Sequence, residues 1–183
     1  KWGLSHVVEH MLFRGSAAYP DSRSLAASFE RAGGILQGST WRDHTHFCTS
    51  LHPSHLGKVL RALSDMISNP QFEGLDVERD IIEEEIQSEL SESGQDIDIN
   101  NISRASVWQG HAMGRRITGS LETVRGFSLD NVVQHHAQHY VGSNLALCVA
   151  GRVDAQLVQE LAQEAFGHLR RGQRSQDGDP ARF

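Results

Sequence analysis

Apolar residues recur along most of the chain at the three- and four-residue spacing of amphipathic helices. Several runs carry a boundary signal. Asp21 can cap a helix start and Pro53 suits a first helical position, whereas Gly33-Gly34 and Asn69-Pro70 end the runs before them. The pattern predicts helices at residues 4–14, 21–32, 53–69, 75–90, 97–109, 128–140 and 154–168.

Strands are fewer. Two apolar runs, Ile35–Trp41 and Thr45–Leu51, predict strands joined by polar residues 42–44, and a third strand is expected at Leu145–Ala150. Because helices outnumber strands and do not alternate with them, we expect an α+β fold with an antiparallel or mixed sheet covered by helices. One domain should occupy residues 1–169, followed by a polar linker or tail at 170–183.

Composition excludes several classes of function. The 183 residues are 38% hydrophobic, as in a soluble globular protein. A membrane span needs about 18 consecutive apolar residues, and no run is that long. A net charge of −6 argues against nucleic acid as a partner.

Cys48 and Cys148 lie in apolar, strand-like runs, so both are predicted to be buried free thiols. No targeting signal is visible, and the compartment is expected to be bacterial cytoplasm or periplasm.

The first helix carries a candidate metal site. His6 and His10 are four positions apart and share a face with Glu9, while the rest of the circumference is apolar. Burying these polar groups without partners would cost several kcal/mol, at about the scale of a buried amide. Two imidazoles at this spacing can bind one zinc ion, and Glu9 can accept a proton from a water molecule beside it.

A third protein ligand is expected at a catalytic zinc. In the helix at 75–90, Glu85 and Glu78 fall on the apolar side of the helical wheel, whereas Glu83 and Glu84 fall outside it. Glu89 shares the apolar side and is a weaker candidate. A buried cation would explain carboxylates in such positions.

These motifs resemble those of the pitrilysin-type zinc peptidases, which include insulin-degrading enzyme and the mitochondrial processing peptidase. The segment from Gly3 to Ser16 is similar to the family's H-x-x-E-H helix, and Glu78–Ile86 is similar to the segment that supplies the third ligand, 75 positions after His10. The resemblance covers nearly the whole chain. The family also has strands ahead of the zinc helix, which would be missing here.

The resemblance implies a role for each residue. His6, His10 and Glu85 would bind one Zn²⁺ per catalytic domain, Glu9 would be the general base, and Glu78 would be an acidic residue that supports the metal site. An extended peptide would pair with the strand edge at residues 35–40, which points to substrate-binding residues Gln37, Gly38, Ser39 and Thr40. The pair Gln37-Gly38 departs from the Asn-Ala of many family members.

The implied activity is hydrolysis of unfolded peptides or leader segments by a zinc metalloendopeptidase, of which this chain is one half. A second homologous domain or subunit would close over the peptide as a clamshell. The alternative is a catalytically silent family member that serves as a partner or scaffold subunit. Those members have damaged metal motifs, whereas His6, Glu9, His10 and Glu85 are all present here. A purely structural zinc is a third possibility, in which Glu9 would have no use.

Overall fold

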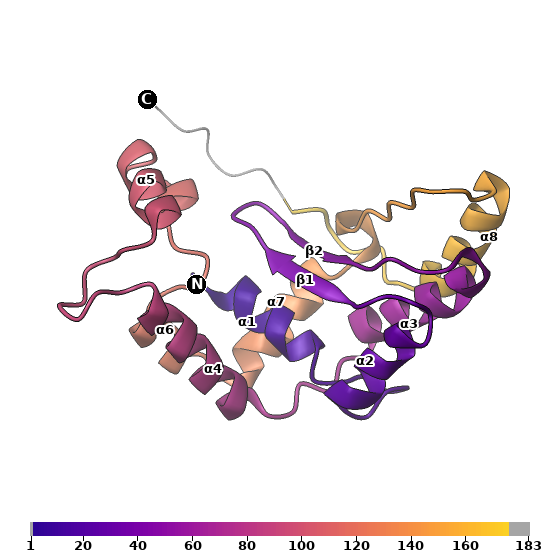
Figure 1. The fold of residues 1–183 in the computed structure, drawn as a ribbon, viewed down its shortest axis with the longest axis horizontal. Helices are drawn as coiled ribbons and strands as arrows, with labels where there is room; N and C mark the ends of the chain where they lie inside the picture. Colours follow the sequence, from indigo (N-terminus) through magenta and orange to yellow (C-terminus); the bar gives the residue numbers. More distant parts are fainter. Residues whose placement is uncertain (1, 176–183) are drawn as a thin grey trace.

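The structure, a computed structural model, describes residues 2–175 (Figure 1). Its longer elements are helices α1 (Leu4–Leu12), α2 (Ser22–Glu30), α3 (Leu56–Ser68), α4 (Leu75–Ser88), α5 (Ile99–Val107), α6 (Leu121–Arg125), α7 (Leu129–His139) and α8 (Ala155–Phe166), with strands β1 (Gln37–Thr40) and β2 (Thr45–Cys48). Three short 3₁₀ turns lie at Pro53–His55, Ala112–Gly114 and Gly142–Asn144.

Helix α1 lies at the centre of the fold, as its nearly continuous apolar surface predicts. It packs against α4, α7 and the β1–β2 hairpin (Figure 1). The side chains that fill the core from this helix are all fully or almost fully buried: Leu4, Val7, Val8, Met11 and Leu12. Its start requires a glycine, because Gly3 has φ 81° and a Cβ there would lie 2.7 Å from the Thr118 carbonyl oxygen.

The strands form one antiparallel hairpin, in which Gln37 pairs with Cys48 and Thr40 pairs with Thr45. Both strands are shorter than predicted, because hydrogen bonds join them only near the turn. The α+β class is confirmed, with a sheet that has two strands among residues 2–175. No helix in this part of the chain is both long and apolar enough to cross a membrane.

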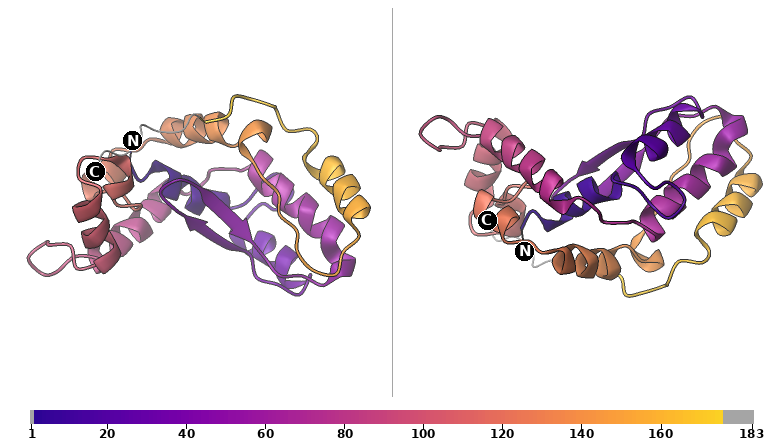
Figure 2. Two further views of the ribbon diagram at one scale, coloured as in Figure 1. Left: turned by 90° about the horizontal axis from the view of Figure 1, so that it is seen from above. Right: turned by 90° about the horizontal axis from the view of Figure 1, so that it is seen from below.

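The molecule is elongated and curved, with α5 near one end and α8 near the other (Figure 2). Helix α8 packs against α3 in a second small apolar cluster made by Leu56, Leu60 and Ala165. Beyond α8, the carbonyl groups of Arg170 and Arg171 accept hydrogen bonds from Gly142 and Ser143. The first residues of the predicted tail therefore contact the body of the fold, and the boundary after residue 169 stays a prediction.

Three predictions at this level were wrong or incomplete. Residues 145–150 are not a strand, because no described segment supplies a hydrogen-bonding neighbour, although Leu145 has extended backbone angles. Cys48 and Cys148 are exposed rather than buried, because neither side chain faces the core. Helix α6 was not predicted, although Ser120 and Thr123 form a capping box at its start.

Candidate metal centre

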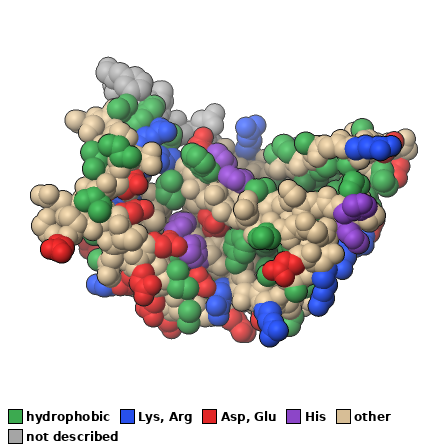
Figure 3. Space-filling model, in the orientation of Figure 1, with side chains coloured by type: hydrophobic (Ala, Val, Ile, Leu, Met, Phe, Trp, Pro, Cys, Tyr) green, Lys and Arg blue, Asp and Glu red, His purple; other side chains and the backbone are tan. Residues whose placement is uncertain are grey.

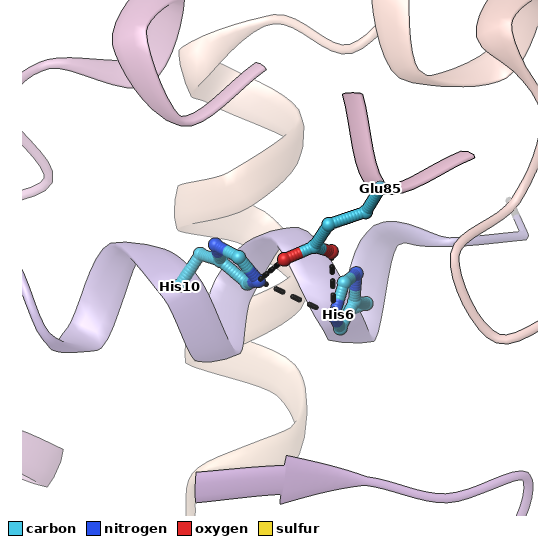
Figure 4. A group of neighbouring side chains, drawn as sticks. All are labelled: His6, His10 and Glu85. Atoms are coloured by element: carbon cyan, nitrogen blue, oxygen red, sulfur yellow. Dashed lines mark hydrogen bonds and ion pairs between the residues drawn. The ribbon is translucent and has the colours of Figure 1, made fainter. Parts of the chain in front are cut away.

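Three predicted ligands come together between α1 and α4. The Nε2 atoms of His6 and His10 lie 3.3 Å apart, and each lies 3.7 Å from one oxygen of Glu85 (Figure 4). The i and i+4 positions place both rings on one side of α1, and Glu85 reaches them from the facing side of α4. Among the described residues this is the one group of three His, Cys, Asp or Glu side chains whose ligand atoms converge, all within 4.8 Å of one another.

The spacing suits a tetrahedral ion. Nitrogen and oxygen ligands at 2.0–2.2 Å from zinc lie about 3.3–3.6 Å from each other in a tetrahedron. The two imidazoles approach each other at this distance, and Glu85 needs only a small shift to do the same. Zinc therefore fits this donor set of two imidazoles and one carboxylate.

Glu78 sets the orientation of His10. Its Oε2 atom lies 3.0 Å from His10 Nδ1, and its Oε1 atom accepts from Arg14 at 3.4 Å. A carboxylate only accepts hydrogen bonds, so Nδ1 carries the proton and neutral His10 presents a lone pair at Nε2. Arg14 was not predicted to belong to this site, although its position four residues after His10 places it on the same face of the chain.

The electrostatic surroundings favour a cation. Burial and the neighbouring His10 lower the pKa of His6 to about 4, so its ring is neutral near pH 7. Burial opposes protonation of His10, but the hydrogen bond to Glu78 and the charges of Glu85, Glu78 and Glu9 outweigh it and raise its pKa. Burial raises the pKa of Glu85 despite the opposing effect of His10. Acidic side chains also gather over α4 on the molecular surface (Figure 3).

The hydrogen bonding of the His6 ring also favours a cation between the two imidazoles. Its Nδ1 atom is buried and has no hydrogen-bond partner among the described residues. Its Nε2 atom faces that of His10, and two lone pairs at 3.3 Å repel each other unless a proton or a metal ion lies between them. A zinc ion bound by both Nε2 atoms would relieve this repulsion, with the proton of each ring on its Nδ1 atom.

Glu9 lies beside the ligands without joining them. Its side chain is buried, and its Oε2 atom accepts a hydrogen bond of 2.5 Å from Thr40 Oγ1. The absence of a side chain at Gly38 makes room for it, because a Cβ there would lie 2.7 Å from both Glu9 Oε1 and the Phe13 ring. A cleft of about 330 Å³ opens here, lined by Glu9, His10, Phe13, Arg14, Ser22, Gly38 and Glu78.

The four predicted substrate-binding residues divide into two kinds. Trp41 and His44 form a hydrogen-bonded pair, because the Trp41 N–H donates to the His44 carbonyl. Along an antiparallel ladder such pairs alternate with pairs whose backbone groups point away from the partner strand. Gln37 and Ser39 therefore use their backbone groups toward β2, whereas those of Gly38 and Thr40 point to the opposite edge of β1. No described strand pairs with that edge. The substrate-binding roles of all four residues remain predictions.

The weaker candidate, Glu89, lies away from the metal centre. Its Oε2 atom accepts from Arg116 at 2.6 Å and from the Asn101 amide at 3.0 Å. These contacts tie the end of α4 to α5 and to the loop before α6. The apolar side of a helical wheel therefore also includes carboxylates that are satisfied by ordinary ion pairs.

Two family models match the chain. Residues 1–120 match the model described as "Insulinase (Peptidase family M16)", and residues 126–183 match the one described as "Peptidase M16 inactive domain". The first match includes every residue of the metal centre.

Curated relatives carry both peptidase and respiratory-complex names. "Mitochondrial-processing peptidase subunit beta" of Dictyostelium discoideum is 29% identical over 96% of this chain and 37% of its own length. An "uncharacterized zinc protease" of Bacillus subtilis is 27% identical over 90% of this chain and 40% of its own. "Cytochrome b-c1 complex subunit 1, mitochondrial" of Bos taurus is 28% identical over 91% and 35%. The chain thus spans about two fifths of the length of these relatives.

Solved structures share the fold. A protease from Helicobacter pylori superimposes with a TM-score of 0.85 at 21% identity, over 98% of this chain and 43% of that one. A peptidase M16 inactive domain from Pseudomonas fluorescens gives 0.84 at 15% identity, over 99% and 44%. At such identities the likeness shows the fold alone.

Proposed function

Because the chain belongs to the insulinase family of peptidases, M16, we propose that it is the zinc-carrying half of a metalloendopeptidase. The observation that carries this proposal is the convergence of His6, His10 and Glu85 beside the carboxylate of Glu9. The substrates are unfolded peptides or leader segments.

Each residue then has a chemical task. His6, His10 and Glu85 would hold zinc, which when bound would supply a Lewis acid that acidifies water and polarises the scissile carbonyl. Glu9 accepts the proton of the attacking water and delivers it to the leaving amine. Thr40 occupies Oε2 of Glu9, and no described residue donates to Oε1, so Oε1 is the oxygen that handles the proton.

The free edge of β1 selects the substrate. A peptide that lies along this edge pairs its backbone with Gly38 and Thr40 and passes the cleft containing Glu9 and His10. Only a segment without its own backbone partners can pair in this way. Folded proteins are therefore poor substrates, and extended peptides are good ones.

A second homologous domain or subunit completes the site by covering the peptide. The length of the relatives supports this part of the proposal, since this chain accounts for 37% of the Dictyostelium protein and 40% of the Bacillus protein. The rival function is a silent partner or scaffold subunit, favoured by the likeness to the bovine cytochrome b-c1 subunit.

Metal analysis of the full-length protein tests the proposal. We expect one zinc per chain, loss of zinc in His6→Ala and Glu85→Ala, and hydrolysis of an unstructured peptide that stops with a chelator and returns with zinc. A zinc-loaded full-length protein that cleaves no unstructured peptide would contradict catalysis and support the scaffold function.

A further inference from the structure

A chain of hydroxyl groups leads from Glu9 away from the cleft, along the face of the β1–β2 hairpin that packs on α1. Thr40 Oγ1 lies 2.5 Å from Glu9 Oε2 and 3.3 Å from Thr45 Oγ1. The phenol of Tyr140 lies next to Thr45, and both side chains line a second pocket. Three elements, α1, β1 and β2, are thereby connected at the carboxylate of Glu9.

The direction of these hydrogen bonds follows from counting hydrogens. An ionised carboxylate only accepts, and each hydroxyl has one hydrogen to donate. Thr40 uses its hydrogen on Glu9, so Thr45 must donate to Thr40. Thr45 has then used its own hydrogen, so in any hydrogen bond between Thr45 and Tyr140 the phenol is the donor. Every donor therefore points toward Glu9.

Tyr140 is suited to the far end of the chain. Burial, together with the negative charge of Glu9, raises the pKa of Tyr140, so the phenol keeps its proton near pH 7. Its ring stacks on His136 with centroids 4.8 Å apart and packs against the main core. The donor at this end is thus fixed in both protonation and position.

The hairpin fixes the middle of the chain. Thr40 and Thr45 face each other as the last pair before the turn, and both side chains lie on the face toward α1. Directly opposed side chains in a pair without ladder hydrogen bonds approach each other closely. The register of β1 against β2 therefore decides where Glu9 Oε2 is held.

We propose that Thr45 and Tyr140 are positioning residues, which act through Thr40 to hold the Glu9 carboxylate with Oε1 toward the cleft. This inference rests on the proposed function, since it assigns a role in the proton transfer that Glu9 performs. The hydroxyl chain itself transfers no proton to the substrate. It restricts rotation of the carboxylate, and a general base is effective only within hydrogen-bond reach of its proton.

The experiment uses the full-length protein and isosteric variants. Thr45→Val and Tyr140→Phe each remove one hydroxyl with little change of shape, Thr45→Ser keeps the hydroxyl, and Thr49→Val removes a hydroxyl outside the chain as a matched control. We expect kcat to fall about 10-fold in Thr45→Val, KM to change less than about 2-fold, and Thr45→Ser to recover kcat. Zinc content should be unchanged in all four.

Coupling provides a second readout. Because both residues act through one chain, the double variant Thr45→Val with Tyr140→Phe should lose no more kcat than Thr45→Val alone. If Thr45→Val unfolds or loses zinc, Tyr140→Phe decides alone. Full kcat in Tyr140→Phe, or in Thr45→Val, overturns the positioning role.

The two proposals fail in different ways. If the wild type cleaves peptide and Glu9→Gln does not, the peptidase function holds, and full kcat in Thr45→Val contradicts only the positioning role. If wild type and Glu9→Gln are equally inactive with zinc bound, the peptidase function itself is contradicted.

Discussion

At the scale of single residues, the proposed metal centre depends on side chains that are not themselves ligands. Glu78 is buried, with its carboxylate shared between His10 and Arg14. It keeps the proton of His10 on Nδ1 and increases the basicity of Nε2. Partners of this kind commonly determine metal affinity as strongly as an imperfect ligand does.

We therefore expect Glu78→Gln to weaken zinc binding by about 10- to 100-fold, because an amide lacks the negative charge that supports His10. Competition with a fluorescent chelator measures this affinity. Glu83→Gln is the matched control on the same helix, since Glu83 pairs with Arg125 instead. An equal loss of affinity in both variants would show that general charge, rather than the contact with His10, is responsible.

The sequence was sufficient to predict which three candidate ligands converge, but not the residues that we propose to position Glu9. The helical wheel predicted the faces that carry His6, His10 and Glu85, because helical periodicity is a local property of the sequence. Thr45 and Tyr140 are 95 positions apart along the chain, and only the packing of α7 beside the hairpin brings them together. No local pattern contains that information, and none showed that the cysteines face outward.

At the scale of elements, helices were predicted better than strands for a physical reason. A helix satisfies its own backbone, whereas a strand exists only beside another strand. Residues 145–150 have the composition of a strand but no described partner, and the hairpin is shorter than its apolar runs. Helix α7 also makes a side-chain contact with α3: His136 Nε2 donates to the Ile67 carbonyl, 2.7 Å away.

This contact predicts a dependence of stability on pH. Burial lowers the pKa of His136 despite the hydrogen bond to Ile67, so the folded state holds the ring neutral. The unfolded state binds the proton first as the pH falls below about 6.5, and stability is then lost. The thermal midpoint of the full-length protein should therefore decrease between pH 7 and pH 5.

The variant His136→Gln retains a donor for Ile67 but does not titrate, so its midpoint should decrease less over the same range. The exposed His46 provides the control, because His46→Gln should behave as the wild type does. An unchanged pH dependence in His136→Gln would show that other groups determine it.

At the scale of the whole molecule, the chain has the fold of one M16 peptidase half, as the sequence resemblance implied. The α+β class, the central helix and the family are all confirmed. The resemblance implied a second homologous domain or subunit, but the sequence could not predict whether it is fused or separate. The free edge of β1, the cleft beside Glu9 and the greater length of the relatives support a second half that covers the peptide.

The central claim is that Glu9 performs catalysis at a zinc ion held by its neighbours. It is tested most directly by the hydrolysis rate of an unstructured peptide, measured for the full-length wild type and for Glu9→Gln at equal, verified zinc content. We predict that both proteins bind one zinc per chain and that Glu9→Gln loses hydrolysis by a factor of at least about 100. Hydrolysis by Glu9→Gln at the wild-type rate would contradict the account.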